Sequence, residues 1–327
     1  MTADPPCNRR EIPLLGVESR WLAPDGTAIR RFDWAPAGTP PRGRLLFLPG
    51  RGDCYEKYLE AMGHWQARGW AVTALDWRGQ ALSGRLGHDP LTGHIADFAI
   101  WVADLAAFWR DWAAAPGPKV AIGHSMGGHL LLRALAEAAI APDAAVLLAP
   151  MLGLHPTWVP PRLMRAIAAL MCRLGDPARP AWDAGERPGK AADLRQHLLT
   201  HSPERYADEA WWRAARPGLG MGGGSWRWVE RAYASIIGLA RAGVLETVHT
   251  PLLVMASRAD GLVSWPAIER AAARLLKARL VAFDAEVAHE LLREVDPVRA
   301  RVLAEIDSFL DCPFLDHAVP LSQNQQP

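Results

Sequence analysis

The chain of 327 residues has almost no excess of charge of either sign, with 36 Lys and Arg against 35 Asp and Glu. A net charge of +1 removes the electrostatic attraction to phosphate backbones on which non-specific nucleic-acid binding depends. Runs of basic residues are no longer than two, at Arg9-Arg10 and Arg30-Arg31. We therefore expect no nucleic-acid partner.

Cysteine is scarce, and no Cys-x-x-Cys pair occurs. Dense cysteine frameworks are typical of small secreted domains, and closely paired cysteines are typical of zinc sites. We interpret the cysteines as free thiols in a reducing compartment, and we expect neither a metal site nor a cofactor. The four residues are Cys7, Cys54, Cys172 and Cys312.

Long apolar runs are missing as well. The N-terminal sequence MTADPPCNRREIPLL has charges and prolines where a signal peptide needs an apolar stretch. No later segment reaches 18 uncharged apolar residues, the minimum for a membrane-spanning helix. We therefore expect a cytoplasmic protein that does not span a membrane. With 50% hydrophobic and 22% charged residues, the composition is that of an ordinary globular protein.

Short apolar runs alternate with helical patterns along most of the chain, the order that predicts an α/β protein with a mostly parallel sheet. The runs are apolar throughout, as expected for strands buried on both faces. Upstream, Pro24-Asp25-Gly26 forms a turn signal between Val17–Leu22 and Thr27–Trp34, which predicts an antiparallel hairpin. Together these segments predict a mixed sheet of about eight strands. The six parallel strands are predicted at Arg44–Leu48, Trp70–Leu75, Lys119–Ile122, Ala145–Leu148, Pro251–Met255 and Leu280–Phe283.

The clearest helix is predicted from about Ile95 to Trp112, where apolar residues recur at spacings of three and four. Between Leu154 and about Trp228 the alternation gives way to sequence rich in proline and tryptophan, and a helical pattern resumes at Val229–Leu239. We interpret the interruption as an inserted cap. The predicted organisation is an α/β core over residues 1–154 and 229–312, a cap over 155–228, and a loosely ordered tail over 313–327.

A candidate nucleophile lies in the sequence Gly123-His124-Ser125-Met126-Gly127, between a predicted strand and the helical run Gly128–Ala139. This is the context that a nucleophile elbow requires. A serine on such a sharp turn adopts a strained conformation, and glycines two positions to either side leave room for the backbone. Its hydroxyl then lies at a helix N-terminus, where the free N–H groups stabilise negative charge. Because the bare pentapeptide also arises by chance, its position between strand and helix decides the interpretation.

A nucleophilic serine needs a base and an orienting acid, which are expected to follow it in the order Asp, His. Asp260 comes shortly after a predicted strand, and His289 lies between the last predicted strand and the final helical pattern. We predict that His289 is the general base and that Asp260 orients it. Asp284 and Asp296 are rivals for the acid, but they flank His289 in the sequence, where such residues more naturally cap helices or lie in solvated loops.

The oxyanion hole is expected to use two backbone N–H groups, one after the nucleophile and one after an early strand. Met126 follows the nucleophile, and Arg51 lies in the segment LFLPGRGDCYEKY after a predicted strand. We predict these two donors. The side chain of Arg51 is expected to be solvated, and contact with an anionic head group is the alternative.

Several of these segments resemble the serine α/β-hydrolase family, and within it the monoacylglycerol lipase and lysophospholipase (PldB-like) branch. The resemblance implies the α/β-hydrolase fold and an enzyme that cleaves esters of single-acyl-chain lipids through an acyl-Ser125 intermediate. It also implies that the cap shapes an apolar acyl pocket. The chain departs from the family pattern at Pro49-Gly50, where His-Gly is usual, and at Ala81, where glycine is usual. The resembling segments, in family order between about residues 44 and 310, are LPGRGDCYEKY, LDWRGQALSGR, GHIADF, GHSMGG, LLAPML, SRADGLV and AHELLRE.

Other activities would use the same residues. A short-chain carboxylesterase, a thioesterase or an acyltransferase remains open, because an acyl-enzyme can react with different acceptors. A protein that binds lipid without turnover is a further alternative. The predicted partners are a small acyl ester or lipid substrate and, through the cap, a transient membrane contact. Six of the 15 tryptophans lie in the predicted cap, where they either form its core, line an acyl tunnel or rest on a membrane surface: Trp158, Trp182, Trp211, Trp212, Trp226 and Trp228.

Overall fold

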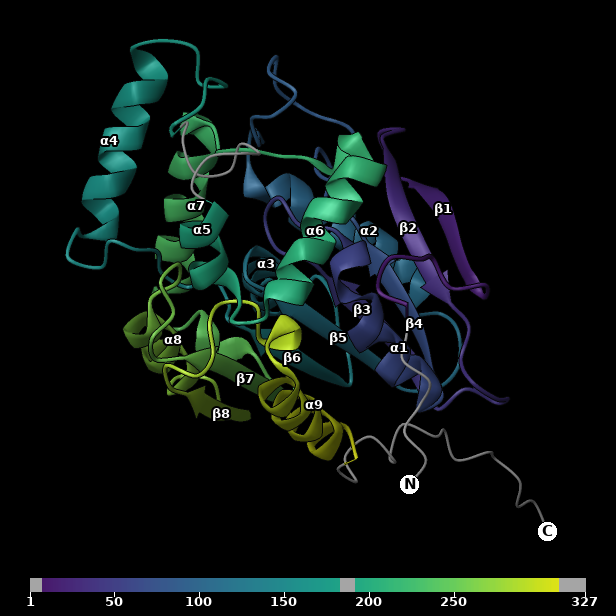
Figure 1. Cartoon of the computed structure of the whole chain (residues 1–327). Helices are drawn as coiled ribbons and strands as arrows, with labels where there is room; N and C mark the ends of the chain where they lie inside the picture. The colour runs from purple at the N-terminus through teal and green to yellow at the C-terminus, as the bar shows by residue number, and fades with distance from the viewer. Residues whose placement is uncertain (1–7, 183–191, 312–327) are drawn as a thin grey trace.

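The structure, a computed structural model, describes residues 8–182 and 192–311. A mixed sheet of eight strands crosses the molecule in the order β1-β2-β4-β3-β5-β6-β7-β8 (Figure 1). The predicted α/β class and strand number are confirmed, and each predicted strand boundary lies within two residues of the observed one. The strands are β1 Gly16–Leu22, β2 Ala28–Trp34, β3 Gly43–Leu48, β4 Trp70–Leu75, β5 Lys119–His124, β6 Ala144–Leu148, β7 Leu252–Ser257 and β8 Ala278–Phe283.

The predicted hairpin forms one edge of this sheet. β1 and β2 pair antiparallel, and β2 also pairs antiparallel with β4, whereas all remaining neighbours are parallel. Every residue of β6 and β7 is buried, as expected for uniformly apolar strands at the centre of a parallel sheet. The carboxyl ends of β5, β6 and β7 therefore lie side by side at one edge, where α/β proteins place their functional groups.

Five helices of the core pack on or beside the sheet. The predicted helix over Ile95–Trp112 begins later than expected, at Phe98, because the side chain of Asp97 accepts a hydrogen bond from the N–H of Ala99 (2.9 Å) and caps the first turn. The helix after the candidate nucleophile begins earlier, at Met126. The core helices are α1 Leu59–Ala67, α2 Phe98–Trp112, α3 Met126–Ala136, α8 Trp265–Ala272 and α9 Asp296–Leu310, with short 3-10 turns η1 Tyr55–Tyr58, η3 Leu245–Thr247 and η4 Leu291–Arg293.

Several helices lie between β6 and β7. They fall in the region predicted as an inserted cap, 155–228, and in the helical pattern predicted after it, Val229–Leu239. In Figure 1 they lie together on one side of the sheet, with α4 at the outer side of α7. The last of them begins at Trp226, earlier than the predicted Val229, because the hydroxyl of Ser225 accepts from the N–H of Trp228 (3.0 Å). The segment contains α4 Pro161–Arg173, α5 Ala192–Leu199, α6 Pro203–Ala215, η2 Pro217–Leu219 and α7 Trp226–Leu239.

Three further expectations concern the cysteines, the C-terminal tail and membrane-spanning helices. Cys54 and Cys172 are free thiols, while Cys7 and Cys312 lie outside the described residues. The predicted tail over 313–327 lies outside them as well. Within the described ranges, none of the helices is long and apolar enough to cross a membrane.

Candidate active site

Ser125 occupies a strained turn between β5 and α3. Its backbone has φ of 52° and ψ of −115°, in a region that residues with a side chain rarely adopt. Its N–H donates to the carbonyl of Leu148 (2.8 Å), and its own carbonyl accepts from the N–H groups of His129 (3.0 Å) and Met151 (3.0 Å). These bonds to the end of β6, to α3 and to the segment after β6 hold the residue in its unusual conformation.

The flanking glycines are required because backbone segments approach them closely. A Cβ added at Gly127 would lie 2.3 Å from the carbonyl oxygen of Leu48 and 2.4 Å from that of Pro49. A Cβ added at Gly123 would lie 2.7 Å from the carbonyl oxygen of Gly127. Any larger residue would therefore push α3 away from β3 and β5, as the sequence motif implied.

The structure brings the three predicted catalytic side chains together. Nε2 of His289 lies 2.9 Å from Oγ of Ser125, and its Nδ1 lies 2.7 Å from Oδ2 of Asp260. His289 and Asp260 are both buried, whereas Ser125 is half-buried. Oδ1 of Asp260 also accepts hydrogen bonds from the N–H groups of Leu262 (2.8 Å) and Val263 (3.0 Å). Ser125 is thus joined through His289, 164 positions later in the sequence, to Asp260 in one continuous hydrogen-bonded chain.

The electrostatics of this chain suit proton transfer. Burial by itself lowers the pKa of His289, but the carboxylates of Asp260, Glu290 and Asp53 together outweigh burial, and the pKa is raised. Burial by itself raises the pKa of Asp260, but His289 and the two backbone donors outweigh it, and the pKa is lowered. Asp260 is therefore ionised near neutral pH and stabilises a proton on His289.

The two rival carboxylates are engaged elsewhere. Asp284 is exposed and pairs with Arg258 (2.8 Å). Asp296 is the first residue of α9, is also exposed, and pairs with Arg205 (2.6 Å). Among the three candidates, Asp260 is the one in contact with His289.

The segment Gly50–Asp53, called the oxyanion loop below, passes beside the nucleophile. A Cβ added at Gly50 would lie 3.2 Å from Cβ of Ser125. Met126 is the first residue of α3, so its N–H has no acceptor within the helix. Both predicted oxyanion donors, the N–H groups of Arg51 and Met126, therefore belong to segments that flank Ser125. Their role stays a prediction.

The DWRGQ segment, which the sequence offered only as a family motif, supports the oxyanion loop. The side-chain oxygen of Gln80 accepts from the N–H of Gly52 (2.8 Å), and the indole N–H of Trp77 donates to the carbonyl of Pro49 (2.7 Å). Pro49 replaces the usual histidine, yet its carbonyl is held in place. Ala81 replaces the usual glycine with φ of 45°, so it adopts a conformation that glycine reaches without strain.

The expectation that the Arg51 side chain is solvated is wrong. Its guanidinium lies over the rings of Trp182 (5.1 Å) and Trp228 (5.3 Å), and NH1 donates to the carbonyl of Gly222 (2.9 Å). Two aromatic faces offer a cation an attraction that compensates for the loss of water. The side chain consequently ties the oxyanion loop to the segment that covers it.

A cavity of about 530 Å³ opens onto Ser125 and His289. Its walls come from the sheet edge and from the segment between β6 and β7, so this segment covers the carboxyl ends of the central strands. Most of the lining is apolar, and the charged lining residues are concentrated around the oxyanion loop and the His289 loop. The apolar residues include Met151, Leu154, Met164, Trp182, Leu198, Trp226, Trp228, Val229 and Val263; the charged ones are Arg51, Asp53, Lys57, Arg195 and Glu290.

The tryptophans of the predicted cap lie in different environments. Trp212 and Trp228 are buried and belong to the hydrophobic core. Trp182, Trp226 and Trp228 line the cavity. Trp158 is 82% exposed. The core and cavity interpretations thus each hold for some of these residues.

Sequence reasoning missed a group of charged side chains beside the site. The side chain of Lys57 is 4% exposed and pairs with two buried carboxylates, Glu209 and Glu290, which lie in separate parts of the chain. The segments DCYEKY and HELLRE contain Lys57 and Glu290, but no local pattern indicates that these charges meet. In the part of the chain that the structure describes, no group of three or more His, Cys, Asp or Glu side chains could hold a metal ion.

The pattern that defines the family described as serine aminopeptidase, S33, matches residues 39–296. The chain belongs to this family of serine α/β-hydrolases. The match covers the sheet from before β3 to the start of α9, and it includes every predicted site residue. The resemblance drawn from the motifs, and with it the α/β-hydrolase fold, is confirmed.

Comparisons with individual proteins agree with this assignment. The chain is 30% identical over 280 residues to lysophospholipase L2 of Escherichia coli strain K12, covering 82% of this chain and 80% of that protein. It is 28% identical over 276 residues to the probable lysophospholipase L2 of Haemophilus influenzae, covering 83% and 84% of the two chains. A solved structure, a soluble variant of monoglyceride lipase from Saccharomyces cerevisiae in complex with a substrate analog, superposes with a TM-score of 0.72 at 18% identity, covering 94% and 98% of the two chains.

Proposed function

We propose that this protein hydrolyses the ester bond of single-acyl-chain lipids, either lysophospholipids or monoacylglycerols, through an acyl-Ser125 intermediate. Its relatives and structural neighbours make it a carboxylic ester hydrolase. The observation that carries the mechanism is the chain of hydrogen bonds from Ser125 through His289 to Asp260 at the wall of a largely apolar cavity.

In this mechanism neutral His289 accepts the proton of Ser125 as Oγ attacks the ester carbonyl. Asp260 keeps the proton of His289 on Nδ1 and stabilises the imidazolium that forms. The N–H groups of Met126 and Arg51 donate to the oxyanion of the tetrahedral intermediate. His289 then gives its proton to the leaving alcohol, and a water molecule activated in the same way releases the fatty acid.

The two parts of the cavity suit the two parts of such a substrate. Apolar side chains such as Met164, Trp226 and Val229 offer surface on which an acyl chain is removed from water. Charged side chains of both signs lie near the oxyanion loop, where a glycerol or phosphate head group has polar partners.

The experiment compares initial hydrolysis rates for a short-chain aryl ester, a long-chain monoacylglycerol and a lysophosphatidylcholine, with Ser125→Ala as the background. We expect turnover of at least one of the two lipids to exceed that of the aryl ester, and loss of nearly all turnover in Ser125→Ala. Turnover of the aryl ester alone would contradict the lipid substrate and favour the short-chain carboxylesterase. Hydroxylamine or an added alcohol as acceptor would reveal acyl transfer, and an acyl thioester in the panel would reveal thioesterase activity.

A protein that binds lipid without turnover needs a separate test, because weak activity and no activity look alike in a rate assay. A fluorophosphonate reacts with an activated serine hydroxyl. We expect labelling of the wild type and none of Ser125→Ala, with unchanged folding by circular dichroism. Absence of labelling in the folded wild type would favour the non-catalytic binder.

We further propose that the outer face of α4 contacts a lipid surface transiently. Four aliphatic residues, three on this helix and one directly after it, recur at spacings of four, three and four, and each is between 41 and 71% exposed: Leu163, Ile167, Leu170 and Leu174. Arg162 and Arg173 are exposed on the same helix, and Trp158 is exposed just before it. An amphipathic helix with an outward apolar stripe and arginines is typical of contact with anionic lipid head groups. Met164 of the same helix lines the catalytic cavity, which would bring a lipid from the surface to the site.

A further inference from the structure

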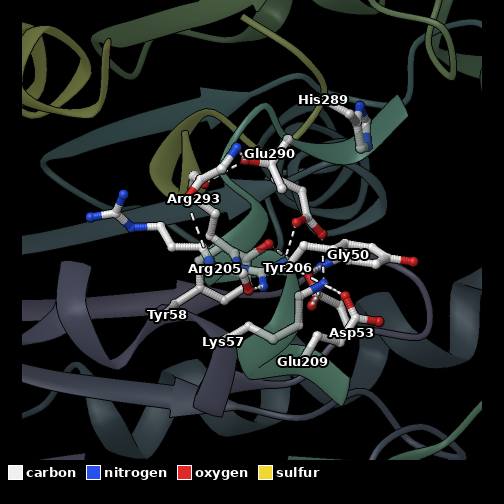
Figure 2. A network of polar contacts seen from close by, with 12 residues as sticks. Gly50, Asp53, Lys57, Tyr58, Arg205, Tyr206, Glu209, His289, Glu290 and Arg293 are labelled. Atoms are coloured by element: carbon white, nitrogen blue, oxygen red, sulfur yellow. Dashed lines mark hydrogen bonds and ion pairs between the residues drawn. The ribbon is translucent and has the colours of Figure 1, made fainter. Parts of the chain in front are cut away.

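The side chain of a lysine, Lys57, is buried at the wall of the cavity, where three segments of the chain meet. The side chain of Lys57 is 4% exposed, and three carboxylates contact its ammonium group: Glu290 at 2.5 Å, Asp53 at 2.9 Å and Glu209 at 3.1 Å (Figure 2). Asp53 belongs to the oxyanion loop, Glu209 to α6, and Glu290 directly follows His289. One ammonium group therefore joins the oxyanion loop, the covering helices and the loop of the general base.

The members of this group are charged. Burial by itself lowers the pKa of Lys57, but the three carboxylates outweigh it, and the pKa is raised. Burial by itself raises the pKa of Asp53, but Lys57, His124 and Tyr58 together outweigh it, and the pKa is lowered. Burial also raises the pKa of Glu209, but Lys57 and three arginines together outweigh it, and that pKa is lowered as well. Burial likewise raises the pKa of Glu290, but Arg293 and then Lys57 outweigh it. The remaining cations around Glu209 are Arg195 (2.9 Å), Arg213 (2.7 Å) and Arg293 (3.6 Å).

Buried ion pairs of this kind contribute little net stability, because desolvation offsets much of the attraction between the charges. Removing one partner alone is costly, since the other is left buried and unpaired. A buried cluster of ion pairs can instead fix the positions of the segments that carry its charged side chains relative to one another. At Lys57 those segments are the ones on which ester hydrolysis would depend.

On one side the lysine fixes the oxyanion loop. Oδ1 of Asp53 contacts Lys57, while Oδ2 accepts from the N–H of Gly50 (3.3 Å) and from the hydroxyl of Tyr58 (2.7 Å). The peptide held in this way immediately precedes Arg51, whose N–H is the predicted oxyanion donor. A shift of Asp53 would therefore move that donor.

On the other side the lysine fixes the loop of the general base. Glu290 is bound by Lys57 and Arg293, and its backbone N–H donates to the carbonyl of Leu199 (2.8 Å). A second connection runs from the hydroxyl of Tyr58 to Nδ1 of His124 (3.0 Å), and from Nε2 of His124 to the carbonyl of His289 (3.2 Å). Two hydrogen-bonded routes thus join the oxyanion loop to His289.

We infer that Lys57 is a positioning residue, which sets the oxyanion loop and the general base at their working separation through Asp53 and Glu290. This inference rests on the proposed ester hydrolysis by Ser125, and it adds a residue that touches neither the nucleophile nor the scissile bond. Because a 1 Å displacement of catalytic groups costs about 10²-fold in rate, the effect is expected in kcat.

The primary variants are Lys57→Met, which removes the charge at similar length, and Lys57→Arg, which keeps it. With a short neutral aryl ester, we expect Lys57→Met to lower kcat by about 10²-fold and to change KM by less than about 3-fold. Inhibition by a trifluoromethyl ketone, whose adduct places an oxyanion in the hole, should weaken in parallel with kcat. Lys57→Arg should recover most of both losses.

The pH profile supplies a readout that a purely structural lysine would not change. Loss of the ammonium leaves Asp53 and Glu290 less compensated near His289, so the pKa of His289 rises. Because only neutral imidazole accepts the serine proton, the acid limb of kcat/KM should move to higher pH in Lys57→Met and stay in place in Lys57→Arg. The charged and titratable groups that face His289 are Asp260, Glu290, Asp53, Lys57, Arg293 and His124.

If Lys57→Met folds poorly, a double variant that removes one positive and one negative charge provides a second test. Glu290→Gln removes one carboxylate, and the double variant Lys57→Met with Glu290→Gln removes one charge of each sign. We expect the two single losses in kcat to be non-additive in the double variant, as for groups in direct contact. Asp104→Asn is the matched control, since it alters a buried ion pair with Arg78 that does not line the cavity.

The inference would be overturned if the losses in kcat were additive in the double variant. It would also be overturned if the acid limb of kcat/KM stayed in place in folded Lys57→Met. A kcat in Lys57→Met equal to that of Asp104→Asn would overturn it as well. Failure of the underlying function looks different, because then the wild type itself shows no turnover and Ser125 takes up no fluorophosphonate.

Discussion

The proposed reactivity of Ser125 would depend on how His289 and Asp260, both buried, hold one proton between them. His289 lies between a hydroxyl at 2.9 Å and a carboxylate at 2.7 Å, and the carboxylate raises the pKa of the imidazole despite its burial. Asp260 is kept ionised by His289 and by two backbone N–H groups. Each residue thus sets the protonation state that the next one needs.

Replacement of Asp260 by asparagine tests this assignment most directly. The amide has almost the same shape but no charge, so it neither stabilises the imidazolium nor holds the proton on Nδ1 of His289. We expect kcat for an ester substrate to fall by about 10⁴-fold, as in other Ser-His-Asp enzymes. Asp284→Asn is the control and should keep kcat within about twofold. A large loss in Asp284→Asn with a mild one in Asp260→Asn would reverse the assignment.

The dependence of activity on pH follows from the raised pKa of His289. Below that pKa the imidazole is protonated and cannot accept the proton of Ser125, so kcat/KM should fall as the pH drops through it. Because the pKa is raised, the fall should begin above the usual titration range of histidine. Initial rates measured with a neutral substrate across the acid range check this, and a flat profile through that range would argue against a histidine base.

At the scale of elements, close packing of β3, β5 and α3 determines where the nucleophile lies. Gly123 and Gly127 allow the start of α3 to touch both strands, so the helix N-terminus points at the same edge as the strand ends. The oxyanion loop then follows β3 directly beside Ser125. Register between parallel strands and contact at two glycines together decide the geometry of the site.

Gly127→Ala should disturb this packing, because its Cβ would lie 2.3 Å from the carbonyl oxygen of Leu48. We expect a loss of about 1–3 kcal/mol in the free energy of unfolding, measured by denaturant titration. The matched control is Gly238→Ala in α7, where a Cβ would meet nothing within 4 Å and alanine favours the helix. Equal effects of the two substitutions would mean that α3 has room to move.

At the scale of the whole molecule, the segment between β6 and β7 serves both the interior and the surface. Its inner side lines the catalytic cavity and binds the oxyanion loop through Arg51 and Lys57. Its outer helix α4 exposes an apolar stripe flanked by arginines. Contact with a lipid surface and access to the site would thus depend on the same helices.

The surface contact can be measured by co-sedimentation with vesicles containing phosphatidylglycerol. We expect the wild type to bind these vesicles, to bind less at high salt, and to lose most binding when Leu170 and Leu174 are both changed to glutamate. Leu276→Glu, at an exposed leucine just after α8, is the matched control and should bind as the wild type does. Equal binding by all three proteins would contradict a role for α4.

Features that depend on neighbouring residues could be predicted from the amino-acid sequence alone. The apolar runs gave the strands to within two residues, and the turn between β5 and α3 was readable because its glycines, serine and helix lie consecutively. The order of Ser125, Asp260 and His289 was predicted for the same reason, since each stands at the end of a recognisable strand. Their catalytic roles stay predictions.

Tertiary structure decided the features that join distant segments. No pattern in the sequence indicated that Arg51 stacks on Trp182 and Trp228, or that Glu209 and Glu290 meet at Lys57. Burying a charge is favourable only when partners of opposite sign or aromatic faces surround it, and those partners come from elements brought together by the packing of the whole chain. Periodicity and local motifs report on the residues next to one another, whereas such partnerships exist only once the fold has formed.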